Sequence, residues 1–257
     1  MLLSISNIAW GASDDETMVE FLRQRGFDGL EIAPTRVFPA PAYDNDPSEF
    51  MGAIEPLAIS SMQSILFGKT ENIFSGLPEY RELLGYTKKA IDFAAGLSCG
   101  NLVFGCPKNR DGYSPAFRDT ALSFFRELGE YAQAMGTVLA LEPNPTIYGT
   151  NFINTTTEAF DFVREADTPG LMVNVDLGTI IHNGEGLDFV GRDIHLINHI
   201  HISEPNLVPI ERRPLHADLA AMLRQNSYSK YVSIEMKAQD NINIVKDVIC
   251  YVQDVFL

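Results

Sequence analysis

Cysteine is scarce in this chain of 257 residues, which contains only Cys99, Cys106 and Cys250. Their spacing forms no paired pattern, so the sequence predicts neither a disulfide framework nor a zinc site built from thiolates. Free cysteines of this kind are typical of a reducing compartment. The apolar residues 2–10 follow no basic leader and form a run too short to span a membrane. We therefore expect a cytoplasmic protein.

Basic residues are scarce too: 19 Lys and Arg stand against 34 Asp and Glu, which gives a formal net charge of −15. Binding to duplex DNA or to an anionic membrane requires clustered cations that neutralise phosphates. The basic groups at 108–110 and 212–213 are too small for that role, although either could hold one anionic group of a small substrate. The charge thus argues against nucleic acid and membrane as partners. It favours a small-molecule ligand and leaves a homo-oligomer open.

The chain also lacks linkers, repeats and low-complexity segments, and its length is that of one barrel domain of about 250 residues. Short apolar runs alternate eight times with segments of helical pattern, which predicts parallel strands joined by helices. Eight such units favour a single (β/α)₈ barrel over residues 1–257. A doubly wound open sheet is the alternative. It is disfavoured because residues 7–13 do not form the glycine-rich loop of a dinucleotide site.

The expected strands are short and end in Pro, Gly or polar residues. They cover residues 3–8, 27–33, 58–66, 101–106, 138–142, 172–176, 199–201 and 232–235. The first expected helix ends at Gly26, a residue typical of helix ends. The others cover residues 49–56, 78–98, 115–135, 155–166, 186–197, 215–225 and 240–256.

The last four expected strands each end in a residue of a type that binds metals, namely Glu142, Asp176, His201 and Glu235. Successive intervals of 34, 25 and 34 residues suit one strand–loop–helix unit per ligand, so four neighbouring parallel strands would bring them to a common edge. His199 shares a strand face with His201, but the strand-end position favours His201. Three carboxylates and one imidazole form a hard site that favours one divalent metal, Mn²⁺, Mg²⁺ or Co²⁺.

Six more polar residues are candidate substrate contacts: five lie toward the ends of expected strands or just beyond them, and His216 lies on the loop that follows the His201 strand. They are Glu31, Gln63, Lys108, Asn144, His216 and Lys237. Glu31 and Gln63 share strand faces with small residues and are expected at the barrel mouth, unless they satisfy a polar network in the core. His216 could instead begin the helix that follows.

The ordered motifs resemble those of a known family. "LEPNP" at Glu142, "VNVDLGT" at Asp176, "HIHISEP" at His201 and "VSIEM" at Glu235 are similar to motifs of the xylose isomerase-like barrels. This superfamily includes sugar phosphate isomerases/epimerases and ketose 3-epimerases. "GLEIAPTR" and "VFGCPKNR" also look like the sugar isomerase branch. The resemblance implies a small sugar or sugar phosphate as substrate and a divalent metal held by these four residues. It implies that Glu142 and Glu235 exchange the substrate proton.

The chemistry has a physical rationale of its own. A proton α to a carbonyl is too weakly acidic for an unaided carboxylate, and a metal on the carbonyl oxygen stabilises the enediolate that forms. The chain departs from the ketose 3-epimerase pattern at Thr179 and Leu207, where that pattern has His and Arg. A metal-dependent lyase similar to inosose dehydratase, and a non-catalytic metal- or sugar-binding barrel, remain alternatives. The apurinic endonucleases of the superfamily use a three-metal cluster with more histidines than this chain supplies.

Overall fold

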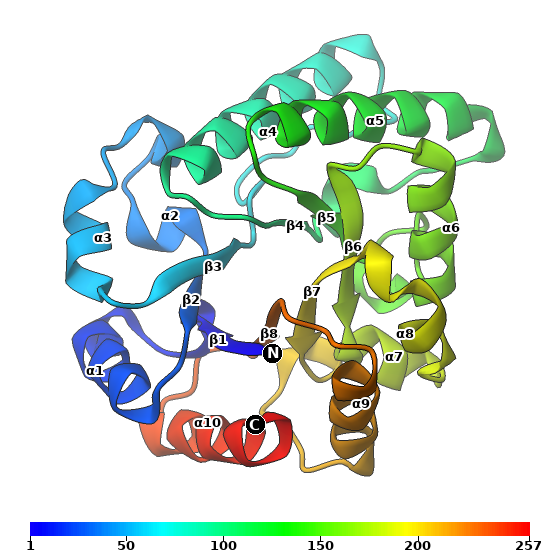
Figure 1. The fold of residues 1–257 in the computed structure, drawn as a ribbon. Coiled ribbons are helices and arrows are strands. Elements are labelled where there is room, and N and C mark those ends of the chain that lie inside the picture. Colours follow the sequence, from blue (N-terminus) through cyan, green and yellow to red (C-terminus); the bar gives the residue numbers. More distant parts are fainter.

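Eight parallel strands form a closed barrel in the computed structural model, which describes residues 1–257. Each strand pairs with the next in the sequence, and β8 pairs with β1 to close the barrel. Figure 1 shows the helices arranged around the strands. The strands are β1 Leu2–Ser6, β2 Gly29–Ile32, β3 Ala58–Met62, β4 Leu102–Phe104, β5 Leu139–Leu141, β6 Leu171–Asp176, β7 Ile197–Ile202 and β8 Tyr231–Ile234. The predicted (β/α)₈ barrel is thus confirmed, and the open sheet is excluded.

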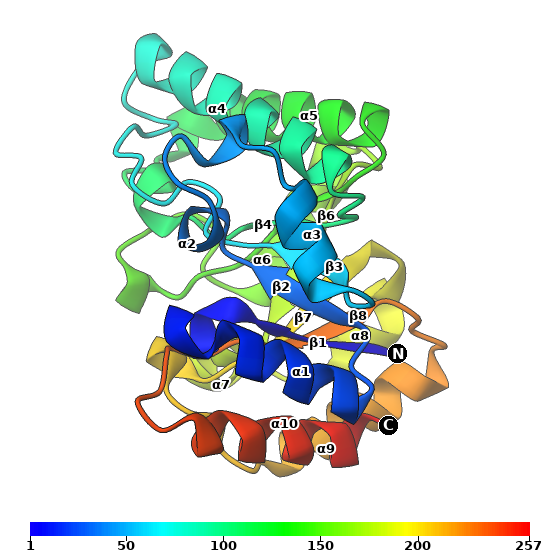
Figure 2. The same ribbon diagram turned by 90° about the vertical axis from the view of Figure 1, so that its left-hand side faces the viewer.

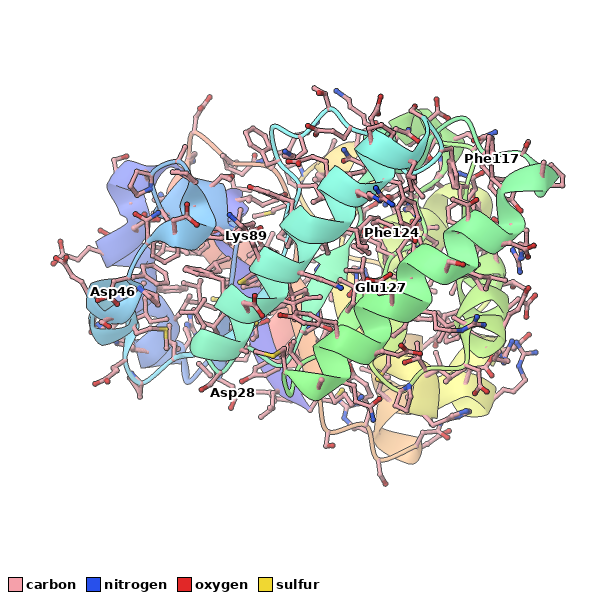
Figure 3. The ribbon with its side chains drawn as sticks, turned by 90° about the horizontal axis from the view of Figure 1, so that it is seen from above. Asp28, Asp46, Lys89, Phe117, Phe124 and Glu127 are labelled. Atoms are coloured by element: carbon pink, nitrogen blue, oxygen red, sulfur yellow. The ribbon has the colours of Figure 1, made fainter.

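The helices fill the intervals between the strands. They are α1 Asp15–Arg25, α2 Pro34–Val37, α3 Ser48–Ile54, α4 Leu77–Gly96, α5 Arg118–Ala134, α6 Thr156–Ala166, α7 Leu177–Asn183, α8 Asp188–Asp193, α9 Pro214–Gln225 and α10 Ile242–Phe256. The long helices α4 and α5 lie side by side on the outside of the barrel (Figure 3). None of the helices is long and apolar enough to cross a membrane.

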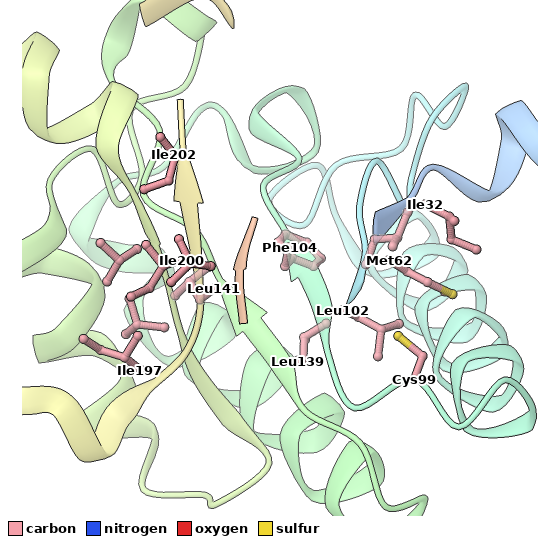
Figure 4. Close-up of a cluster of buried hydrophobic side chains, with 14 of the residues drawn as sticks. Ile32, Met62, Cys99, Leu102, Phe104, Leu139, Leu141, Ile197, Ile200 and Ile202 are labelled. Carbon is pink, nitrogen blue, oxygen red and sulfur yellow. The ribbon is translucent and has the colours of Figure 1, made fainter. Parts of the chain in front are cut away.

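Alternate side chains along each strand point either outward to the surrounding helices or inward to the interior of the barrel. In β4, Phe104 is fully buried and packs edge-to-face on Phe124 of α5, whereas Val103 faces the barrel interior and lines a cavity. Leu139 and Leu141 of β5 belong to the same buried apolar layer as Phe104 (Figure 4). Packing of this layer against the helices leaves the inward positions of the strands free for polar residues.

The region after β6 differs from the sequence-based expectation. Residues 177–183 form the helix α7, which the sequence analysis did not predict. This helix begins here because the Asp176 side chain caps it, accepting a hydrogen bond from the Thr179 backbone N–H at 2.7 Å. The helix expected over 186–197 is shorter: α8 spans Asp188–Asp193, a 3₁₀ turn follows, and Ile197 already begins β7.

Both termini lie at one end of the barrel (Figure 2). The chain enters at the start of β1, and α10 returns to that end after β8. The carboxyl ends of the strands, where barrel enzymes place their reacting groups, therefore face the other way. The loops that leave those ends build the site described next.

Candidate functional site

Glu142, Asp176, His201 and Glu235 come together at the carboxyl ends of β5, β6, β7 and β8. All four are buried, and their candidate ligand atoms lie within 4.8 Å of one another. The Nδ1 atom of His201 lies 2.9 Å from Glu142 Oε1 and 3.2 Å from Glu235 Oε2. Strand register accounts for part of this arrangement, since β6 and β7 pair with Asp176 beside His201.

The donor set of this cluster fits a divalent cation. Burial, reinforced by the charge of Glu142, raises the pKa of Asp176, and burial raises the pKa of Glu235 to about 7. Burial by itself would lower the pKa of His201, but the carboxylates of Glu31 and Glu235 hold it well above its usual value. The cluster thus carries more buried negative charge than one imidazole offsets, and a bound cation would stabilise its ionised form.

Two asparagines and an arginine orient Glu142. Asn174 Nδ2 donates to Glu142 Oε1 at 2.7 Å, and Asn144 Nδ2 donates to Oε2 at 3.0 Å. Arg110 is fully buried and donates from Nη2 to Asn144 Oδ1 and to the Glu142 carbonyl, both at 2.6 Å. Sequence reasoning gave Asn174 no role and considered Arg110 only as part of the basic group at 108–110, which could hold an anionic group of the substrate; the buried Arg110 instead binds Asn144 and the Glu142 carbonyl. Asn174 had a signal, because it shares a strand face with Asp176, whereas Arg110 lies in a 3₁₀ turn without periodicity.

The Asp176 carboxylate is held from two sides. Its Oδ2 accepts from the Thr179 hydroxyl at 2.8 Å as well as from the Thr179 backbone N–H, and Oδ1 accepts from the Ser203 hydroxyl. Thr179 Oγ1 also lies 2.8 Å from the Pro143 carbonyl oxygen. Thr179 is fully buried and positions the candidate ligand. The resemblance implies instead a histidine at this position that contacts the substrate.

Glu31 lies beneath the cluster in a buried polar network, which is the alternative left open for it, and not at the mouth. It is fully buried, does not line the cavity, and lies 3.1 Å from His201 Nε2 through Oε1. Its Oε2 accepts from the Ser233 hydroxyl at 2.9 Å. Burial raises the pKa of Glu31, but the charges of His201 and His199 outweigh it and hold the pKa well below the usual range. With a cation bound, His201 would keep the Nε2 proton in the bond with Glu31, and Nδ1 would lose its proton and bind the cation.

A cavity of about 510 Å³ opens above the cluster, with Glu142, Asp176 and Glu235 on its floor. Three of the six predicted substrate contacts line it: Gln63, Lys108 and Asn144. Tyr148 lines it as well. Its hydroxyl accepts from the Asn206 backbone N–H at 2.8 Å, and burial together with the nearby carboxylates raises the pKa of Tyr148 to about 12.

His216 and Lys237 do not line this cavity, contrary to expectation. His216 is buried in α9, where its Nδ1 lies 2.9 Å from the Tyr251 hydroxyl of α10. Lys237 directs an exposed side chain to solvent, and its backbone N–H donates to the Leu207 carbonyl. Lys237 was expected to continue the strand face of Glu235, but β8 ends at Ile234 and alternation ends with it.

Gly105, just after β4, provides room for the Glu142 carboxylate. A Cβ atom at this position would overlap Glu142 Oε2. A side chain of any size at position 105 would thus displace a candidate ligand, so the β4–α5 loop contributes space instead of a functional group.

A model of the xylose isomerase-like TIM barrel family matches residues 19–250 of the chain. The protein belongs to this family. Among proteins of curated function, none matches the sequence significantly.

Solved structures share the fold of this family member along its whole length. The apo form of the E. coli 3-keto-D-glucoside 4-epimerase YcjR has a TM-score of 0.80 at 21% identity, with 99% of each chain covered. The D-psicose 3-epimerase of Clostridium cellulolyticum H10 has a TM-score of 0.72 at 19% identity, over 100% of this chain and 96% of that one. An L-ribulose 3-epimerase has a TM-score of 0.75 at 16% identity, over 98% and 91%. At these identities the likeness establishes the fold.

Proposed function

We propose that this barrel is a divalent-metal-dependent isomerase or epimerase of a small sugar, which removes a proton α to a carbonyl and returns it through an enediolate. The observation that carries the proposal is the pair of glutamates on the cavity floor. Glu142 and Glu235 both lie within about 3 Å of His201 Nδ1, yet they come from different strands, β5 and β8. When bound, the cation would stabilise negative charge on the substrate oxygen.

The two glutamates differ in how firmly they are held. Both oxygens of Glu142 accept hydrogen bonds, from Asn174 and Asn144. Glu235 approaches His201 through Oε2, whereas its Oε1 accepts no hydrogen bond within the protein. A base needs an oxygen free to take the proton, so we assign proton removal to Glu235 in one direction. Glu142 exchanges the proton on the other side of the substrate through Oε2, which accepts only the Asn144 hydrogen bond and keeps a second lone pair.

The remaining polar groups suit a polyhydroxylated ligand. Gln63, Asn144 and Tyr148 line the same cavity and supply amide and hydroxyl groups near the floor. The names of the similar structures support the proposal, because a 3-keto-D-glucoside 4-epimerase, a D-psicose 3-epimerase and an L-ribulose 3-epimerase each invert a carbon next to a carbonyl.

The test is deuterium uptake from D₂O, read by mass spectrometry with added Mn²⁺ or Mg²⁺. The panel holds 3-keto-D-glucosides, D-psicose, L-ribulose, ketose phosphates and inososes. We expect metal-dependent uptake in the wild type and a loss of at least about 10³-fold in Glu142→Gln and in Glu235→Gln, since each removes a proton-transfer group. Glu127→Gln is the matched control, because Glu127 pairs with Lys88 on the outer surface of α5 (Figure 3).

The mass of the product separates the reaction classes. An isomerase or epimerase conserves substrate mass apart from the exchanged deuterium, whereas a lyase product is lighter by one water. Uptake that persists in both glutamate variants would contradict the assignment of proton transfer to Glu142 and Glu235. No uptake from any substrate by the metal-loaded protein would contradict the proposal and favour a binding barrel.

A further inference from the structure

The outer part of the cavity has an apolar wall that the proposed proton transfer does not use. Phe67, in the β3–α4 loop, lines the cavity with its side chain 71% exposed, the largest exposure among the large hydrophobic residues. Large apolar groups left in water beside a cavity are typical of ligand-binding surfaces. The other apolar residues of the lining are Ile8, Leu66, Val103, Cys106, Pro107 and Leu207.

The loop that carries Phe67 is tightly folded. Two consecutive turns enclose this residue, closed by hydrogen bonds of 2.9 Å from Phe67 N–H to the Ser64 carbonyl and from Lys69 N–H to the Leu66 carbonyl. Ser64 adopts φ 52°, a left-handed conformation that is unfavourable for a residue with a side chain. Gly68 follows at φ 85°. Unfavourable backbone of this kind is found where the surrounding contacts enforce it, often at ligand sites.

The β4–α5 loop holds this wall in place. Asn109 is buried, and its Nδ2 donates to the carbonyls of Lys69 at 3.2 Å and Glu71 at 2.8 Å. The Asn109 carbonyl accepts from the Ile73 N–H at 2.9 Å. These bonds fix the backbone that follows Phe67 before any ligand binds, which lowers the entropic cost of ordering this segment on binding.

The charges that face the cavity do not suit a phosphate group. Lys69 is neutralised by Glu71 at 3.3 Å and Glu82 at 2.8 Å, so Lys108 is the one lining cation without an ion pair. Three carboxylates occupy the floor. Even with a divalent cation on these carboxylates, Lys108 would be the single unpaired cation available to a phosphate dianion, and no arginine lines the cavity to form the clamp that commonly holds one.

We infer that the substrate is an unphosphorylated keto-sugar that carries an apolar substituent, an aryl or alkyl aglycone that lies against Phe67 while the sugar ring lies over the carboxylates. This inference rests on the proposed function for the sugar end. It agrees with the size of the cavity, since about 510 Å³ falls in the range of about 300–1,000 Å³ that accommodates ligands larger than one hexose.

The test compares kcat/KM for phenyl and methyl 3-keto-β-glucosides with the metal-loaded protein. We expect the wild type to favour the phenyl compound by about tenfold or more, as an apolar pocket contact gives, and Phe67→Ala to lose most of this preference. Leu77→Ala is the control, because Leu77 is 56% exposed at the start of α4 but does not line the cavity, and its preference should equal that of the wild type.

Calorimetric binding of the unoxidised phenyl and methyl β-glucosides separates the apolar wall from the chemistry. A preference for binding the phenyl glucoside that Phe67→Ala removes would support the inference even without turnover of any keto-sugar. The absence of turnover would in that case overturn the proposed function alone. Turnover with equal kcat/KM for phenyl and methyl compounds would overturn the inference alone. So would higher kcat/KM for a ketose phosphate or for a keto-disaccharide. Neither turnover nor binding would overturn both.

Discussion

The two halves of the barrel contribute different things to the site. The second half, β5 to β8, delivers the four candidate ligands on the ends of its strands. The first half, β1 to β4, delivers support, space and an apolar wall through Glu31, Gly105 and Phe67. The charged groups that fit proton transfer thus lie on strand ends, whereas the features that fit substrate selection lie in loops, as barrel enzymes generally arrange them.

The largest expected effect comes from removing the imidazole of the second half. His201→Ala deletes the Nδ1 donor at the centre of the cluster and leaves Glu31 without its main partner. We expect Mn²⁺ affinity, measured by calorimetry, to fall by more than the factor of about 10–100 that changes around a ligand typically cause. His195→Ala, at an exposed position, is the control. Unchanged affinity would remove His201 from the candidate ligand set.

The next largest effect is expected from a substitution in the first half of the barrel. Gly105→Ala places a methyl group where Glu142 Oε2 lies, so the carboxylate must move. Misplacement of a reacting group by about 1 Å can cost about 10²-fold in rate, and we expect a loss of that order in kcat. The melting temperature should change little, because the end of the flexible Glu142 side chain can move aside. Gly85→Ala, in α4 with nothing near its added Cβ, should leave kcat unchanged.

Glu31 tests whether the first half supports the second from below. Glu31→Gln keeps the shape but weakens the acceptor for the His201 Nε2 proton, 3.1 Å away. We expect Mn²⁺ affinity to fall by about 10–100-fold, the range found for partners of ligand histidines, with the overall fold retained by circular dichroism. An affinity equal to that of the wild type would show that the Glu31 carboxylate is not needed to hold the imidazole.

Sequence reasoning succeeded where the signal was local. The strands from β5 to β8 are buried, short and apolar, and each brings a ligand-type residue to the same edge, so the cluster of Glu142, Asp176, His201 and Glu235 could be predicted from periodicity and spacing. The barrel followed from counting alternations. The helix α7 was missed because its cap, Asp176, was considered only as a ligand.

Sequence reasoning failed for residues whose role depends on how deep they lie in the barrel or on contacts between loops. Alternation predicts correctly that Glu31 faces the barrel interior, but it does not tell the mouth from the layer below, where Glu31 pairs in register with Ser6 and Ser61. Gly105 and Arg110 act only because the β4–α5 loop approaches the end of β5. A contact between two loops leaves no periodic pattern in either, so the contacts of Gly105 and Arg110 with Glu142 could not be predicted from the chain alone.

The smallest effect is expected from Thr179, a support that belongs to the second half itself. Thr179→Val removes a fully buried hydroxyl that lies 2.8 Å from both Asp176 Oδ2 and the Pro143 carbonyl oxygen. We expect the free energy of unfolding in urea to drop by about 1–3 kcal/mol, because these two buried oxygens lose a hydrogen-bond donor. Mn²⁺ affinity should change by less than about tenfold, since the Thr179 backbone N–H still donates to Asp176 Oδ2 at 2.7 Å. A larger loss of affinity in Thr179→Val than in Glu31→Gln would contradict the division between the two halves, because support for the ligands would then come mainly from within the second half.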